Sequence, residues 1–276
     1  MRPSEELEQD DGSLRQIVQQ ELEAIIPFSE KVREFLEEIG GMFVMGGQAL
    51  ARSVPFATAD VSYQVESLGA RSLGIAILVA TFAGLVISLQ FAFFLARFGV
   101  QHTVGKVVVL TLFRELAPVL TALTVGARIG SGIAAELGSM KVTEQLDAIR
   151  ALGADPLRKL VVPRVLACLV VMPALTVIAD VVGVAAGSAV VKLQYGIPFD
   201  QFYQSVVETA QLGDFTSGVF KGVIFGLIIS VVGCFKGFHV EGGTEGVGRA
   251  TTQTVAIASV AVCLADFFIT KISLAF

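Results

Sequence analysis

The sequence predicts an all-α integral membrane protein with an N-terminal interfacial amphipathic helix, five transmembrane helices, and a short cytoplasmic helix between the second and third spans. Of its 276 residues, 54% are hydrophobic and only 16% are charged, against roughly 25% charged residues in an ordinary soluble domain. Five apolar segments are long enough to cross a bilayer. Arg114 and Glu115 are adjacent within one of them, and charges at that depth normally face a bundle interior or a wet cavity. The competing interpretation is a soluble protein in which the two charges pair inside a buried helix.

Two different segments precede the first long apolar run. Residues 1–28 are polar and acidic, so we expect them to be poorly ordered, and the net charge of −5 mostly describes them. In residues 29–52 apolar side chains recur at helical spacing opposite charged ones, which predicts an amphipathic helix at the membrane surface. A soluble helix packed on a partner is the alternative. The first long apolar run begins near residue 72 with no signal peptide before it, so we expect a cytoplasmic N-terminus.

The five predicted spans cover residues 73–96, 107–135, 161–191, 218–235 and 255–276. A spanning helix needs about 20 mostly apolar residues, and the fourth segment only just reaches that length. The second and third are longer than needed, which predicts tilt or extension beyond the bilayer. Three prolines within or beside these two segments are candidate kinks: Pro118, Pro163 and Pro173.

Basic residues predict the orientation. With the N-terminus inside, eleven lysines and arginines fall on cytoplasmic segments and five fall on outer ones, which agrees with the positive-inside rule. The C-terminus then lies outside, and the 196–214 connection is expected to form an amphipathic helix on the outer surface. The five basic residues assigned to the outer side are Arg97, Lys106, Lys192, Lys221 and Lys271.

Small residues and cysteines inside the spans favour packing over chemistry. Glycines spaced four apart begin at Gly126, Gly183 and Gly222, and such spacing lets helices approach closely in lipid. The cysteines have no C-x-x-C spacing and are expected to be small buried hydrophobes. The sequence contains no His/Cys cluster that would indicate a metal site and no basic cluster that would indicate nucleic-acid binding. The cysteines are Cys168, Cys234 and Cys263.

The connection after the second span predicts a short amphipathic helix over residues 140–152. Thr143 or Ser139 can cap it, and Gly153 with Pro156 ends it. A glycine-rich segment near the last span, residues 243–250, has the glycine spacing of a phosphate-binding loop. It lacks that motif's lysine and hydroxyl, so we expect a flexible cytoplasmic turn and no nucleotide site in this chain. The apolar strip on the 140–152 helix comprises Leu146, Ile149 and Leu152.

Several stretches of sequence together resemble the MlaE-type permease family, the membrane subunits of ABC lipid transporters that work with MCE-domain proteins. The resemblance covers about residues 30–276 and makes residues 29–276 one permease domain. The matching stretches are Arg114-Glu-Leu-Ala-Pro-Val-Leu-Thr-Ala, Gly126-Ala-Arg-Ile-Gly-Ser-Gly, Ala135-Glu-Leu-Gly-Ser-Met-Lys-Val-Thr-Glu-Gln-Leu-Asp-Ala, Asp155-Pro-Leu-Arg, Gly248-Arg-Ala-Thr-Thr-Gln-Thr-Val255 and Leu264-Ala-Asp-Phe267.

The resemblance implies a non-catalytic subunit of the bacterial inner membrane that moves phospholipid or a related lipid. The implied partners are a second copy, cytoplasmic ABC ATPases, a periplasmic MCE ring and a small STAS-type protein. ATP and Mg²⁺ would bind the ATPase, and this chain would hold no cofactor. The implied lipid-cavity residues are Arg114, Glu115, Leu116, Phe98, Ile87 and Asp266. The ATPase would grip a coupling helix at residues 140–152, with Lys141, Thr143, Glu144, Gln145, Asp147 and Arg150.

The sequence alone leaves more than one role possible for the charged residues of the spans. Arg114 can bind a phosphate bidentately, and Glu115 can hold Arg114 or partner another cation; a purely structural buried pair is the alternative. Phe98 stands where some family members have a tyrosine. A proton-coupled transporter using Glu115, Asp180 and Asp266 is the second function to consider, and a membrane scaffold is the third. Asp180 is not assigned to the lipid site.

Overall fold

The computed structural model describes residues 33, 36–52, 58–273 and 275. The predicted acidic segment 1–28 lies outside these residues. Two compact units divide the chain, Met1–Met45 and Gly46–Phe276, and each is described by itself. Residues 36–51 are helical, within the predicted 29–52 helix. Phe43 on that helix is 78% exposed, as expected for an amphipathic helix, and its position at a membrane surface stays a prediction.

The second unit is built from long helical rods. Some of these rods start with a wider π-helical turn or contain one within their length. The first rod joins α2 (Thr58–Val65), a π turn (Glu66–Ala70) and α3 (Arg71–Ala96). The second joins α4 (Val104–Thr111), a π turn (Leu112–Leu116) and α5 (Ala117–Val142). The third joins a π turn (Leu157–Val161) to α7 (Val162–Tyr195). The remaining helices are α6 (Gln145–Ala151), α8 (Phe199–Thr209), α9 (Leu212–Phe238) and α10 (Gly243–Ser273).

Five of these rods are long and apolar enough to cross a membrane, which confirms the five predicted spans. Each helix is longer than the apolar run that predicted it, because helical hydrogen bonding continues through polar residues beyond the hydrocarbon core. The flexible turn expected at residues 243–250 is wrong, because α10 is already helical from Gly243. The five rods are Ala59–Ala96, Gln101–Val142, Leu157–Tyr195, Leu212–Phe238 and Gly243–Ser273.

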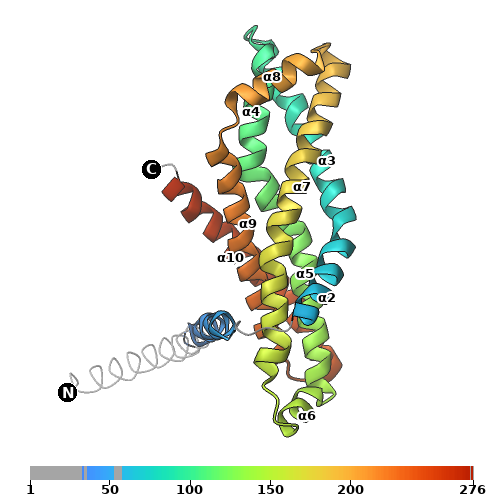
Figure 1. Ribbon diagram of the computed structural model, residues 1–276, viewed down its shortest axis with the longest axis vertical. Helices are drawn as coiled ribbons and strands as arrows, with labels where there is room; N and C mark the ends of the chain where they lie inside the picture. Colours follow the sequence, from blue (N-terminus) through green and yellow to red (C-terminus); the bar gives the residue numbers. More distant parts are fainter. Residues whose placement is uncertain (1–32, 34–35, 53–57, 274, 276) are drawn as a thin grey trace, which may run out of the picture. The chain divides into compact units, whose positions relative to one another are not determined.

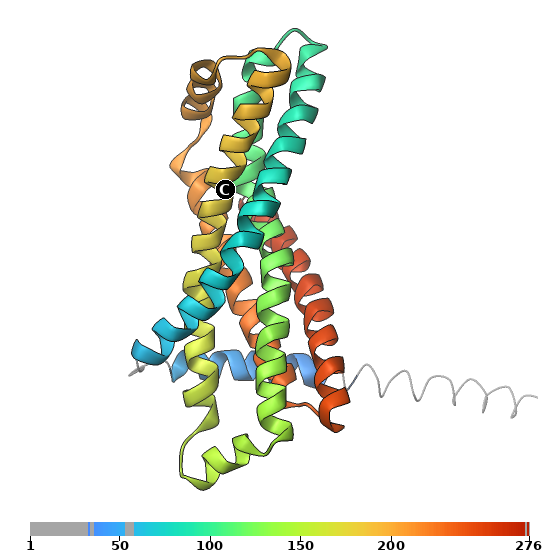
Figure 2. The same cartoon turned by 90° about the vertical axis from the view of Figure 1, so that its right-hand side faces the viewer.

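Short helices mark the two ends of the bundle. Helix α6 lies at one end and α8 at the other, with the spanning rods between them (Figures 1 and 2). Phe202 and Val206 of α8 are buried in a cluster with Val104 and Val108 of α4. The amphipathic helix expected in the 196–214 connection is therefore present and is anchored by its apolar face.

The central helices pack closely through glycine. Helix α5 packs mainly on α9 and α10, α3 on α7, and α7 on α9. A Cβ atom at Gly84 would clash with the backbone of Gly183, so α3 and α7 meet almost backbone to backbone. A Cβ at Gly226 would lie 2.6 Å from the carbonyl oxygen of Cys168. The glycine spacing therefore serves packing within one chain, as the sequence predicts.

Helix α10 lies at the margin of this unit. Only 11% of its most apolar window is buried. Cys263 on α10 is exposed, whereas Cys168 and Cys234 are buried. The prediction of three buried cysteines is therefore wrong for Cys263, because the apolar run around it faces outward instead of into the bundle.

Prolines follow two of the π turns. Pro118 is near the start of α5, directly after the turn Leu112–Leu116, and Pro163 is near the start of α7, after the turn Leu157–Val161. Proline has no N–H to give the preceding turn of an α-helix. In the first case the N–H of Ala117 bonds to the carbonyl of Leu112, five residues back. The predicted irregularities at Pro118 and Pro163 are thus located beside wider turns of the helix.

Candidate charged site within the spans

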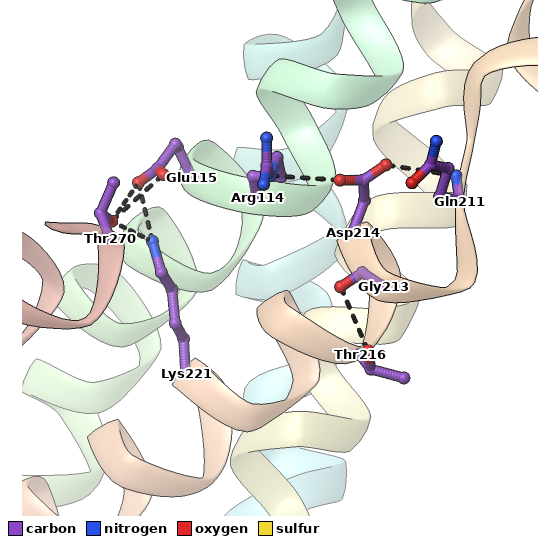
Figure 3. A network of polar contacts seen from close by, with 8 residues as sticks. All are labelled: Arg114, Glu115, Gln211, Gly213, Asp214, Thr216, Lys221 and Thr270. Atoms are coloured by element: carbon purple, nitrogen blue, oxygen red, sulfur yellow. Dashed lines mark hydrogen bonds and ion pairs between the residues drawn. The ribbon is translucent and has the colours of Figure 1, made fainter. Parts of the chain in front are cut away.

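Arg114 and Glu115 lie in the π turn Leu112–Leu116, and their side chains contact different partners (Figure 3). Arg114 reaches toward the start of α9, whereas Glu115 reaches toward Lys221 on α9 and Thr270 on α10. The two residues do not form a pair with each other in this arrangement. Of the two alternatives for Glu115, pairing with Arg114 or with another cation, the structure shows the second: Glu115 pairs with Lys221.

Lys221 is the centre of the larger group. Its side chain is 1% exposed, and its Nζ donates to Glu115 Oε2 and to Thr270 Oγ1, each at 2.8 Å. The same Nζ lies 2.7 Å from Asp266 Oδ1. Thr270 also donates to the Glu115 carboxylate at 3.2 Å. We call Glu115, Lys221, Asp266 and Thr270 the lysine cluster.

The lysine cluster has one more negative than positive charge, since two carboxylates face a single ammonium. The carboxylates are the more accessible members, because the side chains of Glu115 and Asp266 are 40% and 20% exposed. Asp266 Oδ1 is buried and forms no well-oriented hydrogen bond despite its short distance to Lys221. The accessible side of the cluster is therefore anionic.

A second ion pair joins the π turn to the start of α9. Arg114 Nε lies 3.2 Å from Asp214 Oδ1, and the two side chains are 37% and 11% exposed. Asp214 also accepts from the backbone N–H of Gln211 at 3.2 Å and completes a capping box with the Gln211 side chain. The capping contact fixes the carboxylate that orients Arg114. We call Arg114 and Asp214 the arginine pair.

A narrow cavity lies between α3, α5 and α7 beside the π turn. Leu116 lines it, whereas Ile87 and Phe98 are not among the described residues that do. Phe98 is 66% exposed after the end of α3 and contacts Phe94. The predicted site residues thus fall in different places: Arg114, Glu115 and Asp266 in the charged groups, Leu116 at the cavity, and Ile87 and Phe98 apart from both.

Asp180 lies on α7 and belongs to neither charged group. Its side chain is buried, and neither carboxylate oxygen has a hydrogen-bond partner in the part of the chain that the structure describes.

The predicted coupling helix is shorter than the 140–152 segment. Helix α5 continues to Val142, and α6 covers only Gln145–Ala151. Neither Thr143 nor Ser139 caps it; instead Glu144 precedes it in a left-handed conformation, with φ of 59°. Gly153 ends it with φ of 76°, as predicted. The reason is that a tight reversal after α5 needs a left-handed residue where a regular cap would need an extended one.

The residues expected to meet the ATPase do lie together around α6. Leu146 is the buried anchor of the helix, whereas Leu152 is 85% exposed, so the expected apolar strip is only partly covered. Asp147 pairs with Arg150 at 2.7 Å. Among the rest, Lys141 is half-buried, and Thr143, Glu144 and Gln145 are exposed.

Sequence reasoning missed Lys221, Asp214 and Thr270. Lys221 was counted only among the basic residues of the outer side, whereas the structure buries it within α9. The available signal was its place inside the apolar run 218–235, where a charge deserves the same reading as Arg114. Asp214 and Thr270 gave no such signal, since nothing in their spacing indicates that they meet the π turn.

Comparison with known proteins identifies the architecture. Residues 61–272 match the family described as Permease MlaE. The chain belongs to the MlaE permease family. A relative in Synechocystis sp., named "Probable ABC transporter permease protein slr1045", is 42% identical over 75% of this chain and 78% of its own length. A Rickettsia typhi relative, "Probable ABC transporter permease protein RT0041", is 39% identical over 76% of this chain and 81% of its own length.

A plant relative broadens this MlaE permease group. "Protein TRIGALACTOSYLDIACYLGLYCEROL 1, chloroplastic" of Arabidopsis thaliana is 39% identical over 75% of this chain and 59% of its own length. The MlaE permease described here is thus a multi-pass, non-catalytic membrane subunit of an ABC transporter, and such a permease works with ATPase subunits. Family membership favours ATP-driven transport over the proton-coupled alternative.

Proposed function

We propose that this MlaE permease moves phospholipid or a related lipid between the membrane and a partner protein, driven by ATP hydrolysis on a separate subunit. The observation that carries the proposal is the presence of the two charged groups within otherwise apolar spans. A lipid has a polar head and apolar tails, and its site needs apolar walls with a few polar groups. The name of the Arabidopsis relative refers to a glycolipid, which supports lipid as the cargo.

The arginine pair is suited to an anionic head group. Asp214 engages Nε of Arg114, which leaves other guanidinium donors to bind phosphate oxygens. The side chain of Arg114 is 37% exposed and is therefore accessible to a ligand. In this proposal Asp214 orients Arg114, and the lysine cluster contributes carboxylates that complement a positively charged part of the head group.

The proposed assembly follows from size. The cavity beside the π turn has room for only about one water molecule, so it is far too small to hold a lipid. We propose a homodimer that forms a larger cavity between its copies. Cytoplasmic ATPases bind α6 and carry the ATP and Mg²⁺, a periplasmic MCE ring binds the α8 end, and a STAS-type protein assists inside. The bacterial inner membrane holds the complex, with the N-terminus cytoplasmic and the C-terminus periplasmic.

Replacement of the arginine tests the proposal. In proteoliposomes with the partner ATPase, Arg114→Gln is expected to reduce lipid transfer by about tenfold or more, because a charge-assisted phosphate contact contributes roughly 1.5–3 kcal/mol. Assembly with the ATPase should be unchanged. Arg97→Gln is the matched control, since Arg97 lies over the ring of Phe93 after the end of α3, away from both charged groups. Normal transfer by Arg114→Gln would remove the head-group role.

A further inference from the structure

The Asp155-Pro-Leu-Arg stretch, which the transport site does not explain, connects α6 to α7. Asp155 Oδ1 accepts from the backbone N–H of Leu157 at 3.0 Å and so holds the start of the helical rod that becomes α7. Asp155 Oδ2 accepts from Arg52 Nη1 at 2.6 Å. One carboxylate therefore fixes the end of the α6 connection and also ties it to a residue 103 positions earlier in the chain.

A second ion pair repeats this connection one turn along. Lys159 Nζ lies 2.6 Å from Asp60 Oδ2. Asp60 is in the first turn of α2, and Lys159 is in the π turn that leads into α7. Two independent ion pairs thus join the segment that follows α6 to Arg52 and to Asp60.

The base of the same region is closed by a buried arginine. We call residues 136–164, from the last turns of α5 to the first turn of α7, the α6 hairpin. Arg164 is 3% exposed, and its Nη2 lies 3.0 Å from Glu136 on α5. Arg164 Nη1 also donates to the carbonyl of Leu160 at 2.7 Å. The two arms of the α6 hairpin are therefore joined, and a force on α6 is passed to both.

We propose that Asp155 and Lys159 are positioning residues that make Arg52 and α2 follow the α6 hairpin when the ATPase moves it. The inference rests on the function proposed above, with α6 as the ATPase contact. Helix α2 continues through the π turn Glu66–Ala70 into α3. Val79, Ala80 and Ala83 of α3 form one wall of the cavity beside the π turn Leu112–Leu116. Movement of Asp60 therefore gives the ATPase a route to that wall in addition to α5 and α7.

The Lys159–Asp60 pair allows a charge-swap test. Lys159→Asp and Asp60→Lys, each alone, should lower the lipid transferred per ATP hydrolysed by about twofold or more. The double swap should restore it, because the ion pair forms again with its charges exchanged. Exposed ion pairs contribute little to stability, so the melting temperature should change little. Equal defects in the single and double variants would overturn the proposal.

The Arg33–Glu37 pair provides the matched control. It is also exposed, with a separation of 3.2 Å, and its residues are only four positions apart, so it joins no two helices. Arg33→Glu should leave the lipid transferred per ATP unchanged. A defect as large as that of Lys159→Asp would show that any ion pair matters, and it would overturn the specific role given to Asp60 and Lys159.

A cross-link separates failure of this inference from failure of the lipid proposal. In a Cys263→Ser background, Asp60→Cys and Lys159→Cys are joined by a thiol-reactive cross-linker that contains a reducible disulfide bond, and ATP hydrolysis by the full complex is measured. If α2 follows the α6 hairpin, the cross-linked complex keeps its ATPase activity, whatever the cargo. Loss of hydrolysis that a reductant restores would show that the two parts must separate, and it would overturn the inference. Lack of lipid transfer by the unmodified complex would instead count against the proposed function.

Discussion

Lys221 is a cation that two acidic side chains depend on. It contacts Glu115 and Asp266 at 2.8 and 2.7 Å while its own side chain is 1% exposed. Removal of one partner from a buried ion pair is costly, because the remaining charge is left without compensation. The residue is therefore a structural requirement of the site as well as a part of it.

We expect Lys221→Met to lower the free energy of unfolding by about 3 kcal/mol. The substitution keeps the length of the side chain but leaves two carboxylates facing each other between α5 and α10. Thermal unfolding of the detergent-purified protein measures the effect. Lys271→Met is the control, because Lys271 is exposed in the last turn of α10. An unchanged melting temperature for Lys221→Met would show that the cluster does not stabilise the bundle.

At the scale of single residues, the sequence predicts which charged side chains lie within the membrane-spanning helices, but it does not predict which side chains they contact. Arg114, Glu115 and Asp266 stand out because each is charged within an apolar run. Their contacts depend on which helices are neighbours. Glu115 contacts Lys221 and Thr270, which lie 106 and 155 positions after it in the sequence. No local spacing rule relates such positions, so Lys221 and Thr270 became visible only in three dimensions.

At the scale of helices, the apolar pattern of the sequence predicts where each span lies, whereas packing decides where the helix begins and ends. The five spans follow from apolar length. The boundaries do not, because α10 extends twelve residues before its predicted start at 255, through threonines and glycines that helix propensity disfavours. Packing against α5 and α9 overrides that weak preference. The π turns likewise have no signal beyond the prolines that follow two of them.

Charge reversal on α6 tests its proposed contact with the ATPase. We expect Glu144→Lys to reduce the stimulation of ATP hydrolysis by the permease by about fivefold or more, because like charges at an interface are strongly disfavoured. Hydrolysis by the reconstituted complex is the measurement. Glu245→Lys is the control, since Glu245 is an exposed acid in the first turn of α10, which starts toward the α6 end (Figure 2). Equal effects at the two positions would argue against a specific role for α6.

Glycine packing gives a prediction with opposite signs at two positions. Gly226→Ala should lower the free energy of unfolding by about 1–3 kcal/mol, because the new Cβ meets the backbone of α7. Gly132→Ala, on α5, should raise it by about 0.5–1 kcal/mol, because nothing lies within 4 Å of the new atom and alanine favours the helix. Thermal unfolding of both variants provides the comparison. Equal shifts would contradict the close contact between α7 and α9.

The whole molecule places its short helices at opposite ends, and this fixes a test of topology. A membrane-impermeant thiol reagent should label Gln145→Cys only in inverted vesicles and Gln204→Cys only in right-side-out ones. Both positions are exposed, and a Cys263→Ser background removes the exposed native thiol. Labelling of both positions from one side would contradict five crossings between the N-terminal segment and the C-terminus.

At this scale much apolar surface remains uncovered in a single chain. Phe93, Phe267 and Phe268 are each more than half exposed, which suits contact with lipid chains or a second copy. The sequence predicts this outward apolar character, since the spans are apolar on all sides. It does not distinguish lipid from protein as the neighbour, because both offer the same apolar environment.

The π turn at Leu112–Leu116 has a consequence for motion. A π turn holds one residue more than an α turn, so every side chain beyond it is rotated by about 100° relative to an uninterrupted helix. If the extra residue migrates along the rod, only the stretch between its old and new positions turns, while both ends keep their packing. Arg114 and Glu115 lie in the π turn itself. A shift of the extra residue by one turn would therefore reorient these two charges while α4 and the lower part of α5 keep their packing.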